Sequence, residues 1–315
     1  MAASHIRVGT FQFFAAQGET EKVRQLADYA IARHYPDLAQ AENPYLAFLR
    51  AVCQRQAALI AQWMTVGFVH GVMNTDNMAI SGETIDYGPC AFIDQYDRKA
   101  VFSSIDQYGR YAFGNQPAIA QWNLARLAET LLPLLDSQEA EAIRLATAVI
   151  QGFAEQYTTC WLDEMRAKLG LVTRAEDDLT LVNNLYAAME GQQVDFTQFF
   201  RSLSLAVLGN PEPALQLFAD RTKFTDWLEQ WQARAQGEAL SPAERAQAMN
   251  RVNPIYIPRN HKVEEALQSA VAGDLTKFEQ LLTVLAKPFE ERAGLEEYAS
   301  PAPSEFGAYT TFCGT

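Results

Sequence analysis

Two long helical patterns in the sequence enclose one short segment with turn and strand character, and this order constrains the fold most. The first pattern covers residues 44–67, where Asn43-Pro44 provides an N-cap followed by proline at the first helical position. The second covers residues 117–135, which also begin with proline and carry apolar residues at helical spacing. We therefore expect two core helices that flank residues 70–89.

The composition indicates a globular protein. A chain of 315 residues with 49% apolar residues can bury a large core in one or two domains. The formal net charge of −13 argues against a nucleic-acid partner bound through a broad basic surface, although a local patch could hold a nucleotide. No run approaches the ~18 apolar residues of a membrane span, and the start, MAASHIRVGT, lacks the apolar segment of a secretory signal. We expect a cytoplasmic protein with no membrane and no nucleic-acid partner.

The C-terminal half of the sequence is also helical in pattern. Residues 241–244 fit a Ser-x-x-Glu capping box, which predicts a helix start. Gly273-Asp274 separates two further helical segments, at 262–272 and 275–286.

One convincing strand region lies between the two core helices. Residues 78–80 and 84–85 flank a short turn in which Gly82 can take a positive φ. Such a hairpin places Asn77 at its entrance and Asp86 at its exit, so that the two side chains can meet. The expected fold class is therefore mainly α with a small β-hairpin region.

The segment HGVMNTDNMAISGETIDYGP, residues 70–89, matches a phosphotransferase active site except at one position. Kinase-like catalytic loops read His, any residue, Asp, then Asn five positions after that Asp, followed by a metal-binding Asp-aromatic-Gly. His70, Asn77 and Asp86-Tyr87-Gly88 match this order, but Val72 stands at the position of the catalytic Asp. The pattern predicts phosphate chemistry with a different base.

Asn77 and Asp86 are the candidate metal ligands. Magnesium takes hard oxygen ligands, usually one or two from the protein and the rest from water and phosphate. The amide oxygen of Asn77 and the carboxylate of Asp86 would supply such a partial set. The alternative is a loop in which the two residues only cap turns.

Asp76 is the candidate catalytic base. It precedes Asn77 directly and, without an Asp at position 72, is the nearest carboxylate able to act on an incoming hydroxyl. The alternative is a solvated turn residue. For His70 we expect a structural role, in which the ring packs and hydrogen-bonds the backbone.

The four cysteines are scattered and form no zinc-binding cluster. They are Cys53, Cys90, Cys160 and Cys313. Cys53 and Cys160 lie in apolar helical contexts, and we expect both in the core.

Several longer segments closely resemble the selenoprotein O family, also called the YdiU family. They are SHIRVGTFQFFAAQGE at 4–19, HGVMNTDNM, TIDYGP, GRYAFGNQPAIAQWNLARLAETLLPLL at 109–135 and NPIYIPRNHKVEEAL at 253–267. The resemblance extends over essentially the whole chain.

The resemblance implies a protein-kinase-like scaffold that binds ATP in reversed orientation and transfers AMP to hydroxyls of serine, threonine or tyrosine in proteins. UMP transfer has also been attributed to bacterial members. The implied cofactor is Mg²⁺ or Mn²⁺, with ATP as nucleotide donor. Asp76 matches the family's proposed base, Asn77 and Asp86 match its metal ligands, and Arg7 matches an arginine that, with Asp86, holds the nucleotide. Without the family, Arg7 would be read as a surface ion-pair partner.

The resemblance also implies a domain organisation. We expect a kinase-like C-lobe core with the catalytic loop and metal motif at 1–135, a helical C-terminal extension at 136–298 and an extended tail at 299–315. Family members carry an N-terminal lobe with a glycine-rich loop before the segment that begins at Ser4. We expect that lobe to be missing here, so that half of the ATP cleft would be absent.

Two alternatives to an active nucleotidyltransferase follow from that expectation. The chain would be a catalytically inactive interaction module, or it would need a separate N-terminal lobe as partner. An exposed apolar face along residues 1–20, including Val8, Phe11, Phe13 and Phe14, would favour truncation. A conventional kinase is a third possibility, opposed by Val72.

The family also carries a redox-active cysteine or selenocysteine near its C-terminus. This raises the hypothesis of a regulatory disulfide between Cys313 and Cys90, with two unpaired thiols as the alternative.

Overall fold

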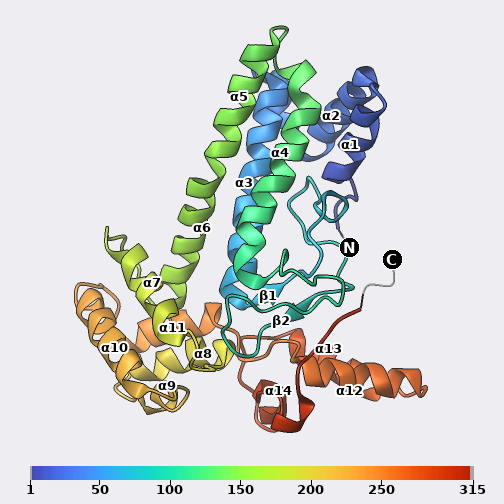
Figure 1. Cartoon of the computed structure of the whole chain (residues 1–315). Coiled ribbons are helices and arrows are strands. Elements are labelled where there is room, and N and C mark those ends of the chain that lie inside the picture. The colour runs from blue at the N-terminus through green and yellow to red at the C-terminus, as the bar shows by residue number, and fades with distance from the viewer. Residues whose placement is uncertain (1, 313–315) are drawn as a thin grey trace.

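The computed structural model describes residues 2–312 and is mainly helical. Four long helices form its centre, and the last two follow one another end to end along the first two (Figure 1). They are α3 (Pro44–Val66), α4 (Gln116–Leu135), α5 (Glu139–Gln151) and α6 (Phe153–Lys168). In residues 2–312 no helix is both long and apolar enough to cross a membrane.

Helix α3 begins and ends where its sequence predicts. The Asn43 side chain accepts a hydrogen bond from the backbone N–H of Leu46 at 3.0 Å, which satisfies one of the free donors of the first turn. Gly67 ends the helix with a φ of 77°, a left-handed conformation that glycine adopts without strain. Asn43 also donates to the carbonyl of Leu135 at 2.8 Å, so the start of α3 is tied to the end of α4.

Two further helices lie against these central helices, α1 (Val8–Ala16) and α2 (Thr20–His34), with a 3₁₀ turn at Pro36–Gln40 (Figure 1). Val8 and Phe11 of α1 are fully buried, whereas Phe13 is 61% exposed. Phe14 is half-buried against the core, so of the four apolar residues named for a possible exposed face only Phe13 is exposed.

Strand structure is smaller than predicted. The hairpin expected at 78–85 is reduced to one antiparallel bridge, Met78 with Thr84, and the neighbouring Ala79 bridges Arg7 instead. The described residues form two short strands, β1 (Phe68–Val69) and β2 (Ala91–Phe92), which pair antiparallel at the end of α3. A 3₁₀ turn at Thr75–Asn77 occupies the end of the predicted catalytic loop.

Five helices pack below α6 and include the predicted capping box. They are α7 (Asp178–Met189), α8 (Phe196–Val207), α9 (Glu212–Leu215), α10 (Arg221–Ala235) and α11 (Pro242–Val252) (Figure 1). Ser241 and Glu244 form the reciprocal capping bonds at the start of α11, which confirms that prediction. Trp227 and Trp231 of α10 stack at 5.6 Å inside this group.

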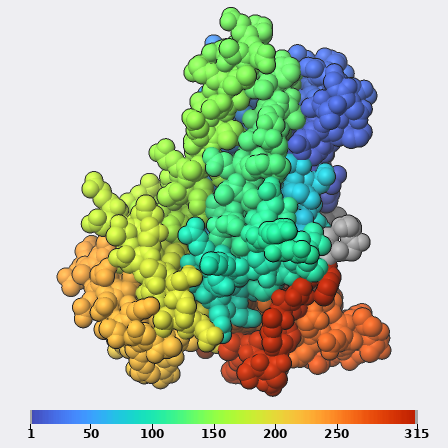
Figure 2. Space-filling model, in the orientation of Figure 1, coloured from blue at the N-terminus to red at the C-terminus, as the bar shows by residue number. Residues whose placement is uncertain are grey.

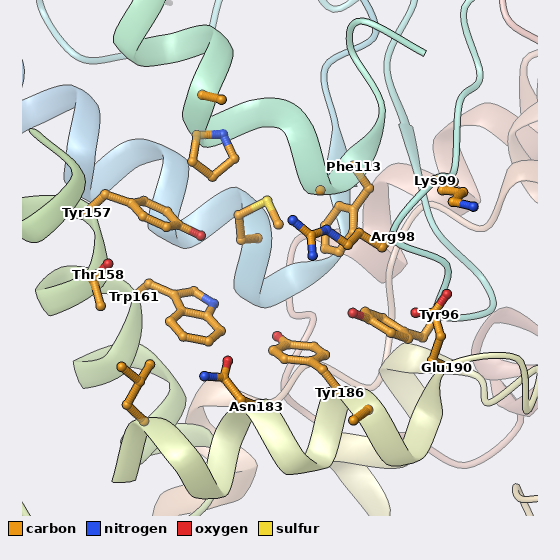
Figure 3. Close-up of a pocket in the computed structure, with 16 residues that line it drawn as sticks. Tyr96, Arg98, Lys99, Phe113, Tyr157, Thr158, Trp161, Asn183, Tyr186 and Glu190 are labelled. Atoms are coloured by element: carbon orange, nitrogen blue, oxygen red, sulfur yellow. The ribbon is translucent and has the colours of Figure 1, made fainter. Parts of the chain in front are cut away.

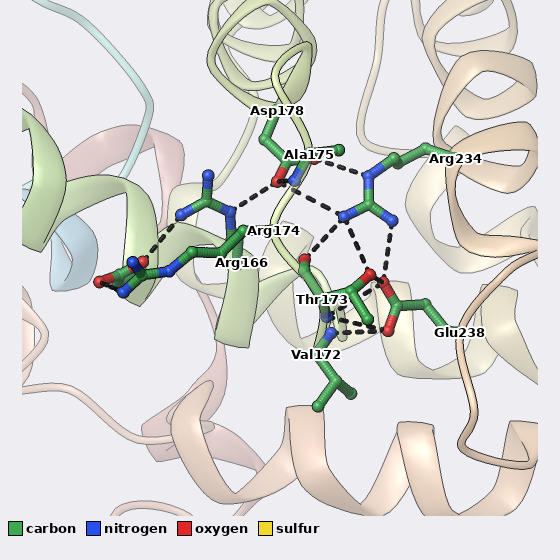
Figure 4. A network of polar contacts seen from close by, with 9 residues as sticks. Arg166, Val172, Thr173, Arg174, Ala175, Asp178, Arg234 and Glu238 are labelled. Atoms are coloured by element: carbon green, nitrogen blue, oxygen red, sulfur yellow. Dashed lines mark hydrogen bonds and ion pairs between the residues drawn. The ribbon is translucent and has the colours of Figure 1, made fainter.

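A buried carboxylate joins three of the helices (Figure 4). Asp178 of α7 accepts hydrogen bonds at 2.6 Å from Nε of Arg166 in α6 and at 2.6 Å from Nε of Arg234 in α10. Glu238 accepts from Arg234 at 2.8 Å and from the Thr173 hydroxyl at 2.7 Å. The network fixes the loop between α6 and α7 against α10.

The last described elements follow α11, and the chain after them contacts residues 89–103. They are α12 (Asn260–Val271), α13 (Thr276–Leu285), α14 (Glu296–Ala299) and a 3₁₀ turn at Ser304–Phe306. Thr311 pairs with the segment at Ser103, and its hydroxyl donates to the carbonyl of Pro89 at 2.7 Å. Figure 2 shows the C-terminal segment, in red, lying against the part of the chain near residue 100, in teal.

Candidate active site

His70 anchors the predicted catalytic loop. Its side chain is fully buried, and Nε2 lies 2.8 Å from the carbonyl oxygen of Ile85, the residue before Asp86. The ring also lies 5.3 Å from that of Trp63 in α3. Burial lowers the pKa of His70, so the neutral imidazole donates to Ile85 and joins the loop to the Asp86 segment. This is the structural role that the sequence suggested.

Gln116, the first residue of α4, holds the same loop from the other side. Its Oε1 accepts the backbone N–H of His70 at 3.0 Å, and its Nε2 donates to the carbonyl of Phe68 at 2.9 Å. The side chain is fully buried. Sequence reasoning missed Gln116, because no local pattern links residue 116 to residue 70.

Asn77 ends the loop with its side-chain oxygen free for a further ligand. Its Nδ2 donates to the carbonyl of Val72 at 2.9 Å, and its backbone N–H donates to Asn74 at 3.1 Å. Among the described residues, no donor is hydrogen-bonded to the Asn77 Oδ1. Since the amide nitrogen is used for positioning, the oxygen can serve as a metal ligand.

Asp86 is exposed and has a left-handed backbone, with a φ of 56°. Aspartate is among the few residues other than glycine that adopt this region, although at some cost in energy. The preceding Ile85 is buried and fixed by His70, which holds the strained residue at the surface.

Asp76 lies in the 3₁₀ turn with a side chain that is 61% exposed. Its backbone N–H donates to the Asn74 side chain at 2.9 Å. Helix α1 passes so close that a Cβ at Gly9 would lie 2.8 Å from Cγ of Asp76 and overlap its carboxylate. Gly9 is therefore a second site residue that sequence reasoning missed; its only signal was its place two residues after Arg7.

Arg7 lies beside Asp76 because its segment pairs with the loop. Val8 donates its N–H to the carbonyl of Met78 at 3.0 Å, and Ile80 donates to Ile6 at 3.0 Å. Arg7 Nη1 then lies 3.3 Å from the carbonyl oxygen of Asp76 and 3.8 Å from its Oδ1. This ion pair also fits the alternative of Arg7 as a surface ion-pair partner.

The structure thus joins Arg7 to Asp76 by direct contact, places Asn77 next to Asp76 in the same 3₁₀ turn and ties Asp86 to this loop through His70. Within residues 2–312, no group of three or more His, Cys, Asp and Glu side chains gathers in a form that could hold a metal ion. The donor set of one amide oxygen and one carboxylate fits Mg²⁺ or Mn²⁺ when phosphate and water complete the shell.

The cysteines fit the predictions in part. Cys53 is fully buried as expected, but Cys160 is only half-buried. Cys90 is half-buried four residues after Asp86, and burial raises the pKa of its thiol to about 11. Cys313 lies outside the described residues, so the disulfide stays a hypothesis.

Comparisons with known proteins give matches over the whole chain. The family model described as protein adenylyltransferase SelO matches residues 1–286. Relatives from Rhizobium leguminosarum bv. trifolii, Agrobacterium fabrum and Mycolicibacterium paratuberculosis are 56%, 54% and 56% identical, and each is named protein nucleotidyltransferase YdiU. The alignments cover 100% of this chain, which spans 64%, 65% and 64% of the length of these relatives. The chain belongs to the SelO family, together with these YdiU relatives.

Proposed function

We propose that Arg7, Asp76, Asn77 and Asp86 form the site of a protein nucleotidyltransferase. It transfers AMP from ATP, or UMP from UTP, to a serine, threonine or tyrosine hydroxyl of a protein. The observation that carries the proposal is the contact of Arg7 with Asp76 in a loop that His70 ties to Asp86. The names of the family model and of the relatives support nucleotidyl transfer.

In the proposed step, the Asp76 carboxylate accepts the proton of the acceptor hydroxyl. The hydroxyl oxygen bonds to the α-phosphorus, the bond between that phosphorus and the pyrophosphate oxygen breaks, and pyrophosphate leaves. Asp76 suits this role because its side chain is 61% exposed, so a protein hydroxyl can reach it. No proton transfer by the neutral, buried His70 is required.

Arg7 has a side chain that is 42% exposed, and its Nη1 lies 3.8 Å from Oδ1 of Asp76, so the guanidinium can turn to bind a phosphate of the nucleotide. Asn77 and Asp86 would hold Mg²⁺ or Mn²⁺ through their side-chain oxygens. The bound ion would neutralise charge on the phosphates.

The kinase-like scaffold at 1–135, the helical extension at 136–298 and the tail at 299–315 are part of the same proposal. Further contacts to the nucleotide would come from an N-terminal lobe of the kind expected from the family. A non-catalytic interaction module is not favoured, because the relatives are named as nucleotidyltransferases.

Label transfer tests the proposal. The chain is incubated with ATP labelled on the α-phosphate and, in parallel, on the γ-phosphate, with Mg²⁺ or Mn²⁺ and a mixture of acceptor proteins. We expect protein-bound α-label only, lost in Asp86→Ala and kept in Asp37→Ala, a control at an exposed aspartate far from the loop in sequence. Transfer of γ-label, or equal α-transfer by Asp86→Ala, would contradict the proposal.

A further inference from the structure

A cavity of about 750 Å³ lies outside the candidate active site, between the segment 96–99, the start of α4 and the helices α6 and α7 (Figure 3). Neither Asp76 nor Asp86 lines it. Its volume lies in the range of small-ligand pockets, roughly 300–1,000 Å³. Its lining combines aromatic rings with a few polar groups.

A row of stacked aromatic rings forms one wall. Tyr157 stacks on Trp161 at 6.5 Å, Trp161 on Tyr186 at 5.8 Å and Tyr186 on Tyr96 at 5.0 Å. The rings form an apolar wall whose edges carry partial positive charge, and Tyr157 adds a hydroxyl group. Such a wall can hold an apolar side chain, and its ring edges can face carboxylate or carbonyl oxygens.

Arg98 adds a full positive charge. Its guanidinium and the Tyr157 hydroxyl point toward one another across the cavity (Figure 3). Within the described part of the chain, Arg98 has no ion-pair partner. A Cβ at Gly114 would lie 2.9 Å from Nε of Arg98, so glycine at this position leaves the space that the arginine occupies. The local sequence thus leaves room for an exposed cation at the cavity, which is free to pair with an anionic group.

The walls are fixed by backbone hydrogen bonds. The backbone N–H of Tyr96 donates to the carbonyl of Val194 at 2.8 Å, which ties the segment 96–99 to the loop between α7 and α8. Phe113 donates to the carbonyl of Ala100 at 3.0 Å. Binding would therefore require little reordering of the backbone.

The cavity also lies next to Gln116, the residue that supports the catalytic loop. Pro117 and Ala118 line it, and they follow Gln116, which accepts the backbone N–H of His70 at 3.0 Å. Three residues that line the cavity are exposed, Arg98, Lys99 and Asn183. A segment of a larger molecule can therefore reach the cavity from solvent.

From these features we infer that the cavity binds an acidic segment of the protein acceptor, with a carboxylate paired to Arg98 and an apolar side chain against Trp161. This inference rests on the proposed function, since it takes the acceptor to be a protein. With a formal charge of −13 on the whole chain, the attraction is local and weakens with added salt. Lys99 contributes a second cation, and Glu190 at the rim disfavours a second acidic group there.

Peptide binding without nucleotide or metal tests the inference. Fluorescence anisotropy compares three fluorescein-labelled ten-residue peptides that each contain one serine and one phenylalanine, with two glutamates, two glutamines or two lysines. The chain should bind the glutamate peptide at least about ten-fold more tightly than the glutamine peptide. Arg98→Ala should remove that preference, and Arg98→Glu should shift it to the lysine peptide.

Arg50→Ala is the matched control, because Arg50 is an exposed arginine of α3 outside this cavity. It should keep the preference for glutamate. Equal binding of the glutamate and glutamine peptides, or an unchanged preference in Arg98→Ala, would overturn the inference. Displacement of the glutamate peptide by an equal concentration of benzoate would also overturn it, in favour of a small-molecule site.

The proposed docking site and the proposed function can be refuted independently of each other. Asp86→Ala should lose nucleotidyl transfer but bind the glutamate peptide as the unchanged chain does, because Asp86 does not line the cavity. A chain that transfers label without preferring the acidic peptide would refute the docking site alone. A chain that prefers the peptide but transfers no label would refute the proposed function alone.

Discussion

Arg7 Nη1 lies 3.3 Å from the carbonyl oxygen of Asp76, a residue 69 positions later in the chain. The contact brings the start of α1 onto the end of the catalytic loop. It depends on the pairing of Val8 with Met78 and on a glycine at position 9 that lets the two backbones approach.

Gly9→Ala should impair nucleotidyl transfer without unfolding the chain. The added methyl group would overlap the Asp76 carboxylate and displace it. Misplacement of a catalytic group by about 1 Å can reduce the rate about 100-fold, so we expect a loss of about 10- to 100-fold. Alanine favours a helix by about 1 kcal/mol over glycine, which partly offsets the strain.

Gly237→Ala serves as the control for that change, since a Cβ at Gly237 meets no atom within 4 Å. Rates of label transfer and thermal unfolding midpoints would be measured for both variants. An active Gly9→Ala enzyme would show that Asp76 need not keep its position.

Gln116→Leu should destabilise the fold and weaken transfer together. The change leaves the N–H of His70 and the carbonyl of Phe68 without their buried partner, which costs about 2 kcal/mol. Urea unfolding measures the stability. Gln232→Leu, at an exposed glutamine of α10, should leave both properties unchanged, and an equally stable Gln116→Leu protein would argue against this anchor.

Asp178→Asn should reduce the free energy of unfolding by about 3–5 kcal/mol, because Arg166 and Arg234 lose a buried partner. Burial alone would raise the pKa of Asp178, but the hydrogen bonds from Arg234 and Arg166 lower it overall. A lowered folded-state pKa gives stability that is present above the unfolded pKa, ~4, and is lost as pH falls.

The difference in unfolding free energy between the unchanged chain and Asp178→Asn should therefore shrink between about pH 5 and pH 3. Asp226→Asn, at an exposed aspartate of α10, should show no such difference. A constant difference across this pH range would mean that the carboxylate charge does not stabilise the network.

Lys168→Met should stabilise the fold most at neutral and lower pH. Lys168 is only 4% exposed, its ammonium group lies 4.1 Å from the centre of the Phe200 ring, and burial lowers its pKa to about 7. Between pH 7 and about 10.5 the unfolded chain binds more protons at this lysine than the folded chain, so stability rises with pH.

Unfolding free energies at pH 6.5 and pH 9.5 check this sign. The advantage of Lys168→Met over the unchanged chain should be larger at pH 6.5, whereas Lys223→Met, at an exposed lysine, should show no pH-dependent difference. An advantage that grows toward pH 9.5 would contradict a buried amine with a lowered pKa.

The sequence predicted the helices well where local signals mark their ends. Asn43-Pro44, Gly67 and the capping box at Ser241 act through bonds within one turn, so their sequence pattern is sufficient. Strands of two residues have too little periodicity to be recognised, which is why the pairing of β1 with β2 was missed.

For the candidate site, the motif order predicted the loop but not its surroundings. The predicted hairpin is a single Met78–Thr84 bridge, because Ala79 pairs with Arg7 from outside the segment. Gly9 and Gln116 act on the loop through contacts with distant residues, and such contacts leave no local pattern. The roles of Asp76, Asn77, Asp86 and Arg7, and the kinase-like scaffold, remain predictions of the family resemblance and of the proposed function.

The most direct test of the site is the binding position of Mn²⁺ in the presence of ATP. Paramagnetic broadening of backbone amide NMR signals reports which residues lie close to the ion. We predict selective broadening at residues 76–78 and 85–88, lost in Asp86→Ala and kept in Asp37→Ala. Broadening that is unchanged in Asp86→Ala, or that is confined to other segments, would show that Asn77 and Asp86 do not hold the metal and would contradict the proposed site.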